Sequence, residues 1–275
     1  MRVTHAWMLM VPVGLILAAT LEALWLQRRD GFYDWSAWFT SLGDLAMRMA
    51  MRLLPLGMAA GALQSLWAHR LTTMPMQQWW PWLVLLVGQD FCYYWMHRAD
   101  HTVRWFWATH SVHHSPEALN LSAAYRLGWT ARLSIAPIFF APLVLIGFPP
   151  ALVGGALAAN LFYQFWLHAT WIPRLGFLEW VLNTPAHHRI HHASNPEYLD
   201  ANFGGVLIVF DRLFGTLVAE RRDVPIRFGL AEPIGSYNPV VIGLHEWRAI
   251  VRDIVAADSM PSALRTALGR PGKLT

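Results

Sequence analysis

Long apolar segments separated by short polar ones constrain the fold of this chain more than any other feature. Residues 6–26 form an apolar run that Arg28 and Arg29 end, and a helix needs about 20 apolar residues to cross a bilayer. We expect a retained helix here rather than a signal peptide, because the run exceeds the usual apolar core of a signal peptide and no cleavage site follows. Further runs occupy residues 53–67, 80–96, 133–148 and 151–167, and the last two are joined by GFPP, a turn-forming sequence. The sequence therefore predicts three single spans followed by a helical hairpin.

The composition agrees with a membrane protein. Hydrophobic residues make up 55% of the 275 residues and charged residues 14%, against about 25% charged residues in a typical soluble domain. The net charge of +4 comes from scattered arginines, which argues against a nucleic-acid interface. A single cysteine, Cys92, excludes an intramolecular disulfide and a cysteine-rich metal site. We expect one all-α integral-membrane domain over residues 1–275, a helical bundle with a polar C-terminal tail at about 254–275.

Basic residues determine the expected orientation in the membrane. With the N-terminus outside, only Arg2 and Arg70 of the 21 basic residues remain on the outer side. The positive-inside rule therefore predicts an external N-terminus and a cytoplasmic C-terminus. In this topology the histidine clusters form a cap on the cytoplasmic face of the bundle.

Ten of the 13 histidines fall into four short groups. The groups are HRADH (His97, His101), HSVHH (His110, His113, His114), the isolated His168 and HHRIHH (His187, His188, His191, His192). Residues three and four apart lie on one face of a helix, so each group can direct its imidazoles to a common point. The other three histidines (His5, His69, His245) are expected at the surface or the membrane interface. Interfacial histidines that bind lipid headgroups, or a pH sensor, are the alternatives.

The clustered imidazoles are expected to hold metal ions. Protonated imidazoles repel one another, and a shared metal removes this penalty because it binds neutral rings. Nine or ten nitrogens exceed what one ion accepts, so the count predicts two ions, each with about four or five imidazoles and an open position. Imidazole suits zinc, copper, iron and nickel. Two such ions beside an apolar cavity favour redox chemistry on a lipid over hydrolysis; a non-enzymatic metal-handling membrane protein is the rival interpretation.

The motifs also resemble a known family. The order HxxxH, HxxHH, an isolated histidine after an apolar hairpin and a second HxxHH is similar to the fatty acid hydroxylase / sterol desaturase superfamily of membrane di-iron oxygenases, over about residues 89–236. The stretches DFCYYWMHRADH, LFYQFWLH, NTPAHHRIHH, NFGGVLIVFDRLFGT and FGLAEPIGSYNP most resemble its alkylglycerol monooxygenase branch and the bacterial relatives of that branch. This resemblance implies a bacterial inner-membrane enzyme with two irons, which zinc can replace on purification. It implies insertion of one oxygen atom from O2 into a C–H bond of a lipid, whether an acyl chain, a sterol or an ether lipid. The electrons would come from a cytochrome or ferredoxin type of protein or from a reduced pterin, and desaturation by the same centre is the alternative reaction.

The resemblance also assigns the metal ligands by position. They would be His97, His101, His110, His113, His114, His168, His188, His191 and His192. His187 precedes the last triplet and is expected beside the ligands or as a partial ligand. Gln164 stands where some relatives have a further histidine. Thr102 stands where the alkylglycerol monooxygenase branch tends to have an acidic residue, which weakens the transfer of an ether-lipid substrate.

Polar residues near the histidines are expected to hydrogen-bond the ligand rings and orient them. A ligating imidazole usually donates its second N–H to a carboxylate or a carbonyl. Asp90 lies two helical turns before His97, and an acidic residue inside a span needs a partner. We expect Asp90 to orient a ligand in this way. The further candidates for such contacts are Asp100, Asp200, Asn202 and Gln164.

Overall fold

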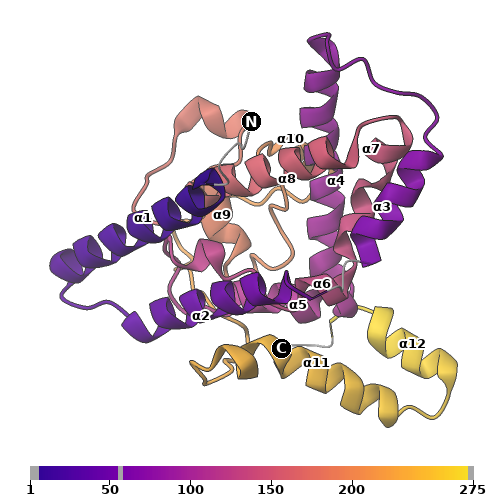
Figure 1. Cartoon of the computed structure of the whole chain (residues 1–275). Coiled ribbons are helices and arrows are strands. Elements are labelled where there is room, and N and C mark those ends of the chain that lie inside the picture. Colours follow the sequence, from indigo (N-terminus) through magenta and orange to yellow (C-terminus); the bar gives the residue numbers. More distant parts are fainter. Residues whose placement is uncertain (1–5, 55–57, 272–275) are drawn as a thin grey trace.

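The computed structural model describes residues 6–54 and 58–271, and in this part helices joined by loops make up the fold (Figure 1). Two isolated bridges, Leu182 with Leu207 and Ala193 with Phe228, form there, and no strand does. The all-α prediction is confirmed. The α-helices are α1 (Ala6–Asp30), α2 (Trp35–Met51), α3 (Met58–Ala68), α4 (Trp80–Thr102), α5 (Arg104–His114), α6 (Ala131–Ser134), α7 (Ala141–Leu145), α8 (Pro150–Phe165), α9 (Pro185–His191), α10 (Val209–Phe214), α11 (Pro239–Val255) and α12 (Met260–Leu268). The 3-10 helices are η1 (Ala123–Tyr125), η2 (Ala136–Phe140), η3 (Trp166–His168) and η4 (Gly176–Trp180).

The helices differ in length from the expected spans. Among the described residues, one helix is long and apolar enough to cross a bilayer, α1 over Met10–Asp30. Helix α4 has 23 residues and reaches about 35 Å. The predicted span at 53–67 is not confirmed by its described part. Helix α3 there has 11 residues and reaches only about 16 Å, against a hydrocarbon core of about 30 Å, and residues 55–57 lie outside the described part.

The predicted hairpin has a broken first arm. The range 133–148 was expected to be one helix, but it contains the end of α6, then η2 and α7. Ile135 has a positive φ of 54° between α6 and η2, and Pro137 and Pro142 each lack an N–H for a helical hydrogen bond. The turn itself is where GFPP predicts it. Gly147 has a φ of 106°, which a glycine adopts readily, and α8 begins at Pro150.

The largest apolar core lies between α4 and the hairpin. Leu85, Cys92 and Tyr93 of α4 pack against a set of buried residues from η2, α7 and α8 that includes Phe140, Leu143, Val144 and Val153. Tyr94 lies on the other side of α4, stacked on Phe214 of α10. These contacts hold the C-terminal end of α4, which carries His97 and His101, in the middle of the molecule.

Helices α11 and α12 lie at the lower edge of the molecule in Figure 1, against α5. Arg104 at the start of α5 donates to Glu246 at 2.6 Å and to Asp253 at 2.8 Å, both on α11. The tail from about residue 254 contains α12, a helix that exposes Met260, Leu264 and Leu268. The two ion pairs of Arg104 fix α5 against α11, and α5 supplies three of the clustered histidines.

Candidate metal centre

Four segments bring the clustered histidines together at the centre of the fold. The C-terminal end of α4 supplies His97 and His101, and η3 supplies His168. Helices α5 and α9 each end in an HxxHH triplet, with His192 as the C-cap residue of α9. The nine nitrogen donors therefore come from helix ends, where the backbone can turn away and leave the side chains packed against one another. All nine imidazoles predicted as ligands lie in this one place.

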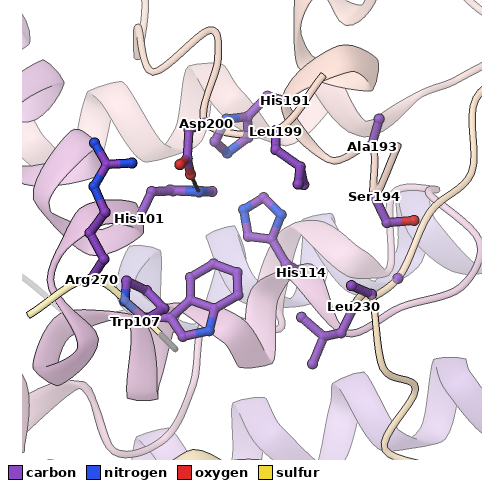
Figure 2. Close-up of a pocket in the computed structure, with 13 residues that line it drawn as sticks. His101, Trp107, His114, His191, Ala193, Ser194, Leu199, Asp200, Leu230 and Arg270 are labelled. Carbon is purple, nitrogen blue, oxygen red and sulfur yellow. Dashed lines mark ion pairs between the residues drawn. The ribbon is translucent and has the colours of Figure 1, made fainter. Parts of the chain in front are cut away.

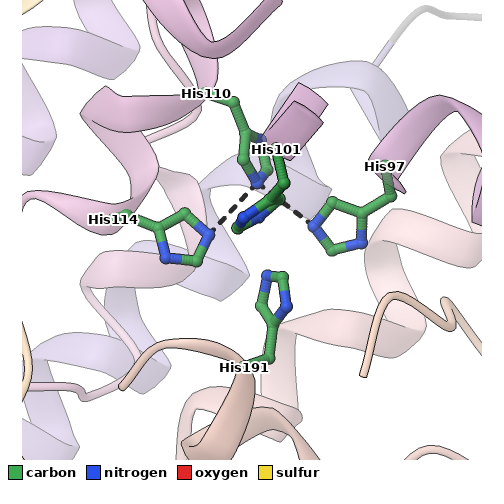
Figure 3. Close-up of side chains that lie close together, drawn as sticks. All are labelled: His97, His101, His110, His114 and His191. Atoms are coloured by element: carbon green, nitrogen blue, oxygen red, sulfur yellow. Dashed lines mark hydrogen bonds between the residues drawn. The ribbon is translucent and has the colours of Figure 1, made fainter. Parts of the chain in front are cut away.

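The nine histidines form two groups. The five-histidine group contains His97, His101, His110, His114 and His191, and the four-histidine group contains His113, His168, His188 and His192. Within each group, one ring nitrogen of every residue lies within 4.8 Å of those of all the others. Figure 3 shows the rings of the five-histidine group pointing toward a common centre. Each group is the size that one metal ion with an open position requires.

The two HxxHH triplets divide between the groups in opposite ways. On α5, His110 and His114 are four residues apart and belong to the five-histidine group, whereas His113 belongs to the other. On α9, His188 and His192 are four apart and belong to the four-histidine group, whereas His191 belongs to the other. Residues four apart lie closest to the same face of a helix, so each triplet gives a pair to one group and a single ring to its neighbour.

Backbone carbonyls fix the orientation of four of the rings. The Nδ1–H groups of His97, His113, His168 and His191 donate to the carbonyls of Phe203 (2.8 Å), Arg126 (3.0 Å), Gln164 (3.0 Å) and Ala201 (2.9 Å). A neutral imidazole carries one proton, so these bonds leave each Nε2 with a lone pair. Two of the lone pairs face each other, because Nε2 of His168 lies 3.4 Å from Nε2 of His113.

This arrangement of lone pairs fits a bound cation. Buried lone pairs that converge without a proton between them repel one another, and a cation at their centre reverses the sign of that interaction. The Nε2 atoms of His101 and His191 are buried and have no hydrogen-bond partner among the described residues. Buried polar atoms normally have a partner, so these two nitrogens indicate a missing ligand. The donor set of imidazole nitrogens suits iron or zinc equally well.

Burial keeps the rings neutral. Burial, together with the smaller effect of neighbouring histidine charges, lowers the pKa of His113 to about 4 and that of His168 to about 3. Burial also lowers the pKa values of His188 and His192 well below the ordinary value of 6.5. At neutral pH these four rings are therefore in the form that binds a metal.

Two of the five predicted supporting residues approach ligand rings with their side chains. Asp100 Oδ2 lies 3.9 Å from Nδ1 of His110, and Asp200 Oδ1 lies 3.6 Å from Nδ1 of His101. Both distances exceed that of a good hydrogen bond. The Asp200 carboxylate acts on His101 through its charge, whereas burial raises the pKa of Asp100 well above the ordinary value. Each stands behind a ring of the five-histidine group.

Asp90 does not orient a ligand ring directly, which corrects the prediction. Its carboxylate accepts from the backbone N–H groups of Val206 and Leu207, both at 2.8 Å, and from the side-chain amide of Asn160 at 2.8 Å. The ring of His97 instead donates to the Phe203 carbonyl. Asp90 therefore positions the loop at residues 203–207, and this loop orients the ring.

Gln164 and Asn202 also differ from the prediction, because their side chains do not contact ligand rings. The side chain of Gln164 bonds Tyr93 and Asn160, and it is the backbone carbonyl of Gln164 that accepts from His168. The side chain of Asn202 bonds the backbone of His187 and of Val218. These two side chains hold backbone segments together and do not contact a ligand ring.

One important residue was missed from the sequence. Asp211 of α10 is fully buried and accepts from the backbone N–H groups of Phe203 and Gly204, each at 2.7 Å, and from the Thr216 hydroxyl at 2.7 Å. It thus anchors the first half of the loop whose second half Asp90 anchors. The available signal was an acidic residue inside the apolar stretch VLIVFDRLFGT.

His187 lies outside both groups. Its side chain is buried, its Nδ1 has no hydrogen-bond partner among the described residues, and burial lowers its pKa to about 4. Its backbone carbonyl accepts from Asn202 at 3.1 Å. The structure therefore places this residue beside the centre and separates it from the other three histidines of HHRIHH.

Two cavities reach the histidines. The Trp107 cavity, of about 380 Å³, touches His101, His114 and His191 and is bordered by Asp200 and Arg270 (Figure 2). The Arg48 cavity, of about 220 Å³, touches His110 of one group and His113 and His168 of the other. Its remaining wall is mostly apolar and includes Met96, Phe106, Leu127, Leu157 and Leu161. Of these two cavities, the Arg48 cavity is the one that meets both groups.

Buried imidazoles in two groups between helix ends define a histidine-rich class of helical protein, and each group is compatible with a bound metal ion. Residues 82–216 match the family model described as fatty acid hydroxylase, so this part of the chain resembles that family. The predicted resemblance is thus confirmed, as is the similarity to the alkylglycerol monooxygenase branch. The chain is 34% identical to an alkylglycerol monooxygenase of Xenopus tropicalis over 98% of this chain and 58% of that protein.

Two further relatives extend the comparison. The chain is 43% identical to an alkylglycerol monooxygenase of Homo sapiens over 64% of this chain and 39% of that protein. It is 29% identical to the ornithine lipid hydroxylase OlsE of Rhizobium tropici over 71% of this chain and 60% of that protein. The chain therefore spans about half the length of the relatives it matches. No solved structure gives a significant match.

Proposed function

We propose that this chain is a membrane-bound lipid monooxygenase that holds two irons, one in each histidine group, and inserts one oxygen atom from O2 into a C–H bond of a lipid. The observation that carries the proposal is the Arg48 cavity, because its mostly apolar wall touches imidazoles of both groups. A lipid chain in this cavity would lie beside both metal positions. The hydroxylase and monooxygenase names of the relatives support the same reaction.

The bound irons would supply the activation of O2, which no protein side chain can perform, with two electrons from an external donor. The residues of the chain supply the geometry. The carbonyls of Phe203, Arg126, Gln164 and Ala201 hold four rings with their Nε2 lone pairs inward. Asp200 stabilises positive charge at the five-histidine group. The apolar wall excludes water and holds the C–H bond in place.

The lipid substrate and the location are further parts of the proposal. Relatives named for alkylglycerol and for ornithine lipid both act on amphiphiles, so we propose a membrane amphiphile as the substrate. Helix α1 would anchor the chain in a bacterial inner membrane, with the N-terminus outside and the histidine cap in the cytoplasm. A redox protein or a reduced pterin would deliver the electrons from the cytoplasmic side.

Growth of expressing cells under ¹⁸O2 followed by lipid mass spectrometry tests this function. The wild-type chain should produce a lipid that gains one ¹⁸O atom, and His191→Ala should abolish it because the five-histidine group loses a donor. His69→Ala is the matched control, since His69 is exposed and lies outside both groups. A lipid that loses two hydrogens and gains no oxygen would show a desaturase. Metal transport into vesicles without any O2 consumption would refute the enzymatic function.

A further inference from the structure

Arg48 of α2 is a half-buried cation that the proposed reaction does not use. It lies outside residues 82–216, the part that matches the family model, yet its side chain lines the Arg48 cavity together with His113 and His168. Its Nε is buried and has no hydrogen-bond partner among the described residues. Asp44, one turn earlier on α2, uses its carboxylate to accept from the backbone N–H groups of Gly128 (3.2 Å) and Trp129 (3.0 Å).

An arginine in such a place is costly without a ligand. Burial lowers the pKa of Arg48, but a guanidinium stays protonated at neutral pH. A buried charge without a hydrogen-bonded partner is strongly unfavourable. Asp100 also lies on the cavity wall, 3.9 Å from Nδ1 of His110 on the histidine side, and burial raises the pKa of its carboxyl well above the ordinary value. Among the described residues Arg48 forms no close ion pair, and its nearest opposite charge is that of Asp44, whose oxygens are held by Gly128 and Trp129. The wall therefore combines a cation without a hydrogen-bonded anion and a mostly apolar surface.

We propose that Arg48 binds the anionic headgroup of the lipid substrate, a phosphate or a carboxylate, while the adjoining chain lies in the Arg48 cavity beside His113 and His168. A guanidinium presents a planar fork of N–H donors that matches the oxygens of both anions. That this ligand is the substrate rests on the proposed function. The inference adds the class of lipid, which is an anionic amphiphile.

The size of the cavity also indicates which part of the lipid is oxidised. A pocket that encloses a whole small ligand typically has about 300 to 1,000 Å³. The Arg48 cavity has about 220 Å³, so it holds only the part of the lipid next to the headgroup. Because Arg48 and the histidines share this small space, the oxidised carbon lies close to the headgroup along the chain. The distal part of the chain then extends outside the cavity.

Equilibrium binding to metal-free protein in a neutral detergent tests the inference. The probes are dodecyl phosphate, dodecanoate and dodecanol, which share one chain and differ in headgroup. We expect the wild-type chain to bind at least one anion more tightly than dodecanol, and the phosphate and carboxylate arms identify which one. Arg48→Gln should raise the dissociation constant of that anion by about tenfold to a hundredfold, the usual effect of losing charged hydrogen bonds. The dissociation constant of dodecanol should change by less than about threefold.

Arg52→Gln is the matched control, because Arg52 lies four residues further along the same segment and is exposed. It removes the same charge and should leave all three dissociation constants within about twofold. Arg48→Lys retains a cation and should keep the preference for an anion if Arg48→Gln does not fold. Equal binding of dodecanol and both anions by the wild type, or equal losses in Arg48→Gln and Arg52→Gln, would overturn the inference. As neither iron nor O2 is present, a chain that binds anions through Arg48 but oxidises no lipid would refute only the proposed function.

Discussion

Replacing Asp211 with asparagine tests how the fold fixes a metal ligand. The two carboxylate oxygens accept from Phe203 N–H and Gly204 N–H, each at 2.7 Å. Asparagine keeps one of these bonds and turns an NH2 group toward the other N–H. The change costs one charge-assisted hydrogen bond and leaves one buried donor unpaired, together about 3 to 5 kcal/mol of the free energy of unfolding. The expected decrease in Tm is roughly 10 °C.

The same substitution should affect one metal more than the other. The Phe203 carbonyl orients His97, a member of the five-histidine group, whereas the four-histidine group has no contact with this carbonyl. Loss of a contact behind a ligand commonly weakens metal affinity by about tenfold to a hundredfold. Asp211→Asn should therefore retain the metal of the four-histidine group and lose much of the other, so metal content falls from two toward one per chain.

Thermal unfolding by circular dichroism and metal analysis by mass spectrometry measure the two effects. Asp223→Asn is the control, because Asp223 is exposed and pairs only with Arg221 at the surface. Its Tm should change by about 1 °C at most, as surface substitutions stay within about 0.5 kcal/mol. An Asp211→Asn chain with unchanged Tm and two tightly held metals would refute the assigned role of the loop.

The remaining predictions concern the histidines and the cavity. His187→Ala should retain both metals, whereas His188→Ala should lose the metal of the four-histidine group; metal analysis of the two variants side by side checks this, and equal losses would contradict the grouping. Leu161→Trp fills the Arg48 cavity and should lower lipid oxidation at least about tenfold with metal content unchanged; undiminished turnover would exclude this cavity as the substrate site. In the metal-free protein, burial lowers the pKa of His113 from 6.5 to about 4, so the unfolded chain takes up this proton at a higher pH than the folded chain. The stabilising contribution of that neutral ring is complete above pH 6.5 and is lost as the pH falls toward 4, by about 2 kcal/mol at pH 5. Unfolding by urea at several pH values measures the loss, and equal stability at pH 7 and pH 5 would contradict it.

The sequence predicted the histidine centre well because its geometry is local. The i,i+3 and i,i+4 spacings of HRADH, HSVHH and HHRIHH place the rings on helix faces before any tertiary contact is known. The predicted helical class follows from the same patterns. The structure gathers the nine histidines that the family resemblance assigned as ligands. The choice of the isolated His168 rested on that resemblance and not on spacing.

The division into two groups could not be predicted in the same way. It depends on how α5 and α9 are rotated relative to each other, which long-range packing decides. The role of Asp211 was missed for a similar reason, because its partners Phe203 and Gly204 lie in a loop whose course has no periodic signal. Asp90 was assigned to His97 by helical spacing, whereas its carboxylate turns toward Val206 and Leu207.

The hairpin shows the limit of hydropathy. Residues 133–148 are apolar enough to suggest one helix, but the backbone at Ile135, Pro137 and Pro142 breaks the segment into short pieces. Apolar composition indicates burial in protein or lipid and does not by itself determine helix length. The same holds for α3, which overlaps the apolar run at 53–67 and has 11 described residues.

Counting bound irons and transferred oxygen atoms on one sample tests the proposed two-iron oxygenase directly. The purified chain in lipid nanodiscs, loaded anaerobically with Fe²⁺ and supplied with a reductant and ¹⁸O2, should bind two irons, one for each histidine group, and transfer one ¹⁸O atom into each lipid product molecule. A chain that binds a single iron with all nine histidines intact, or a lipid product whose new oxygen comes from water, would contradict the account.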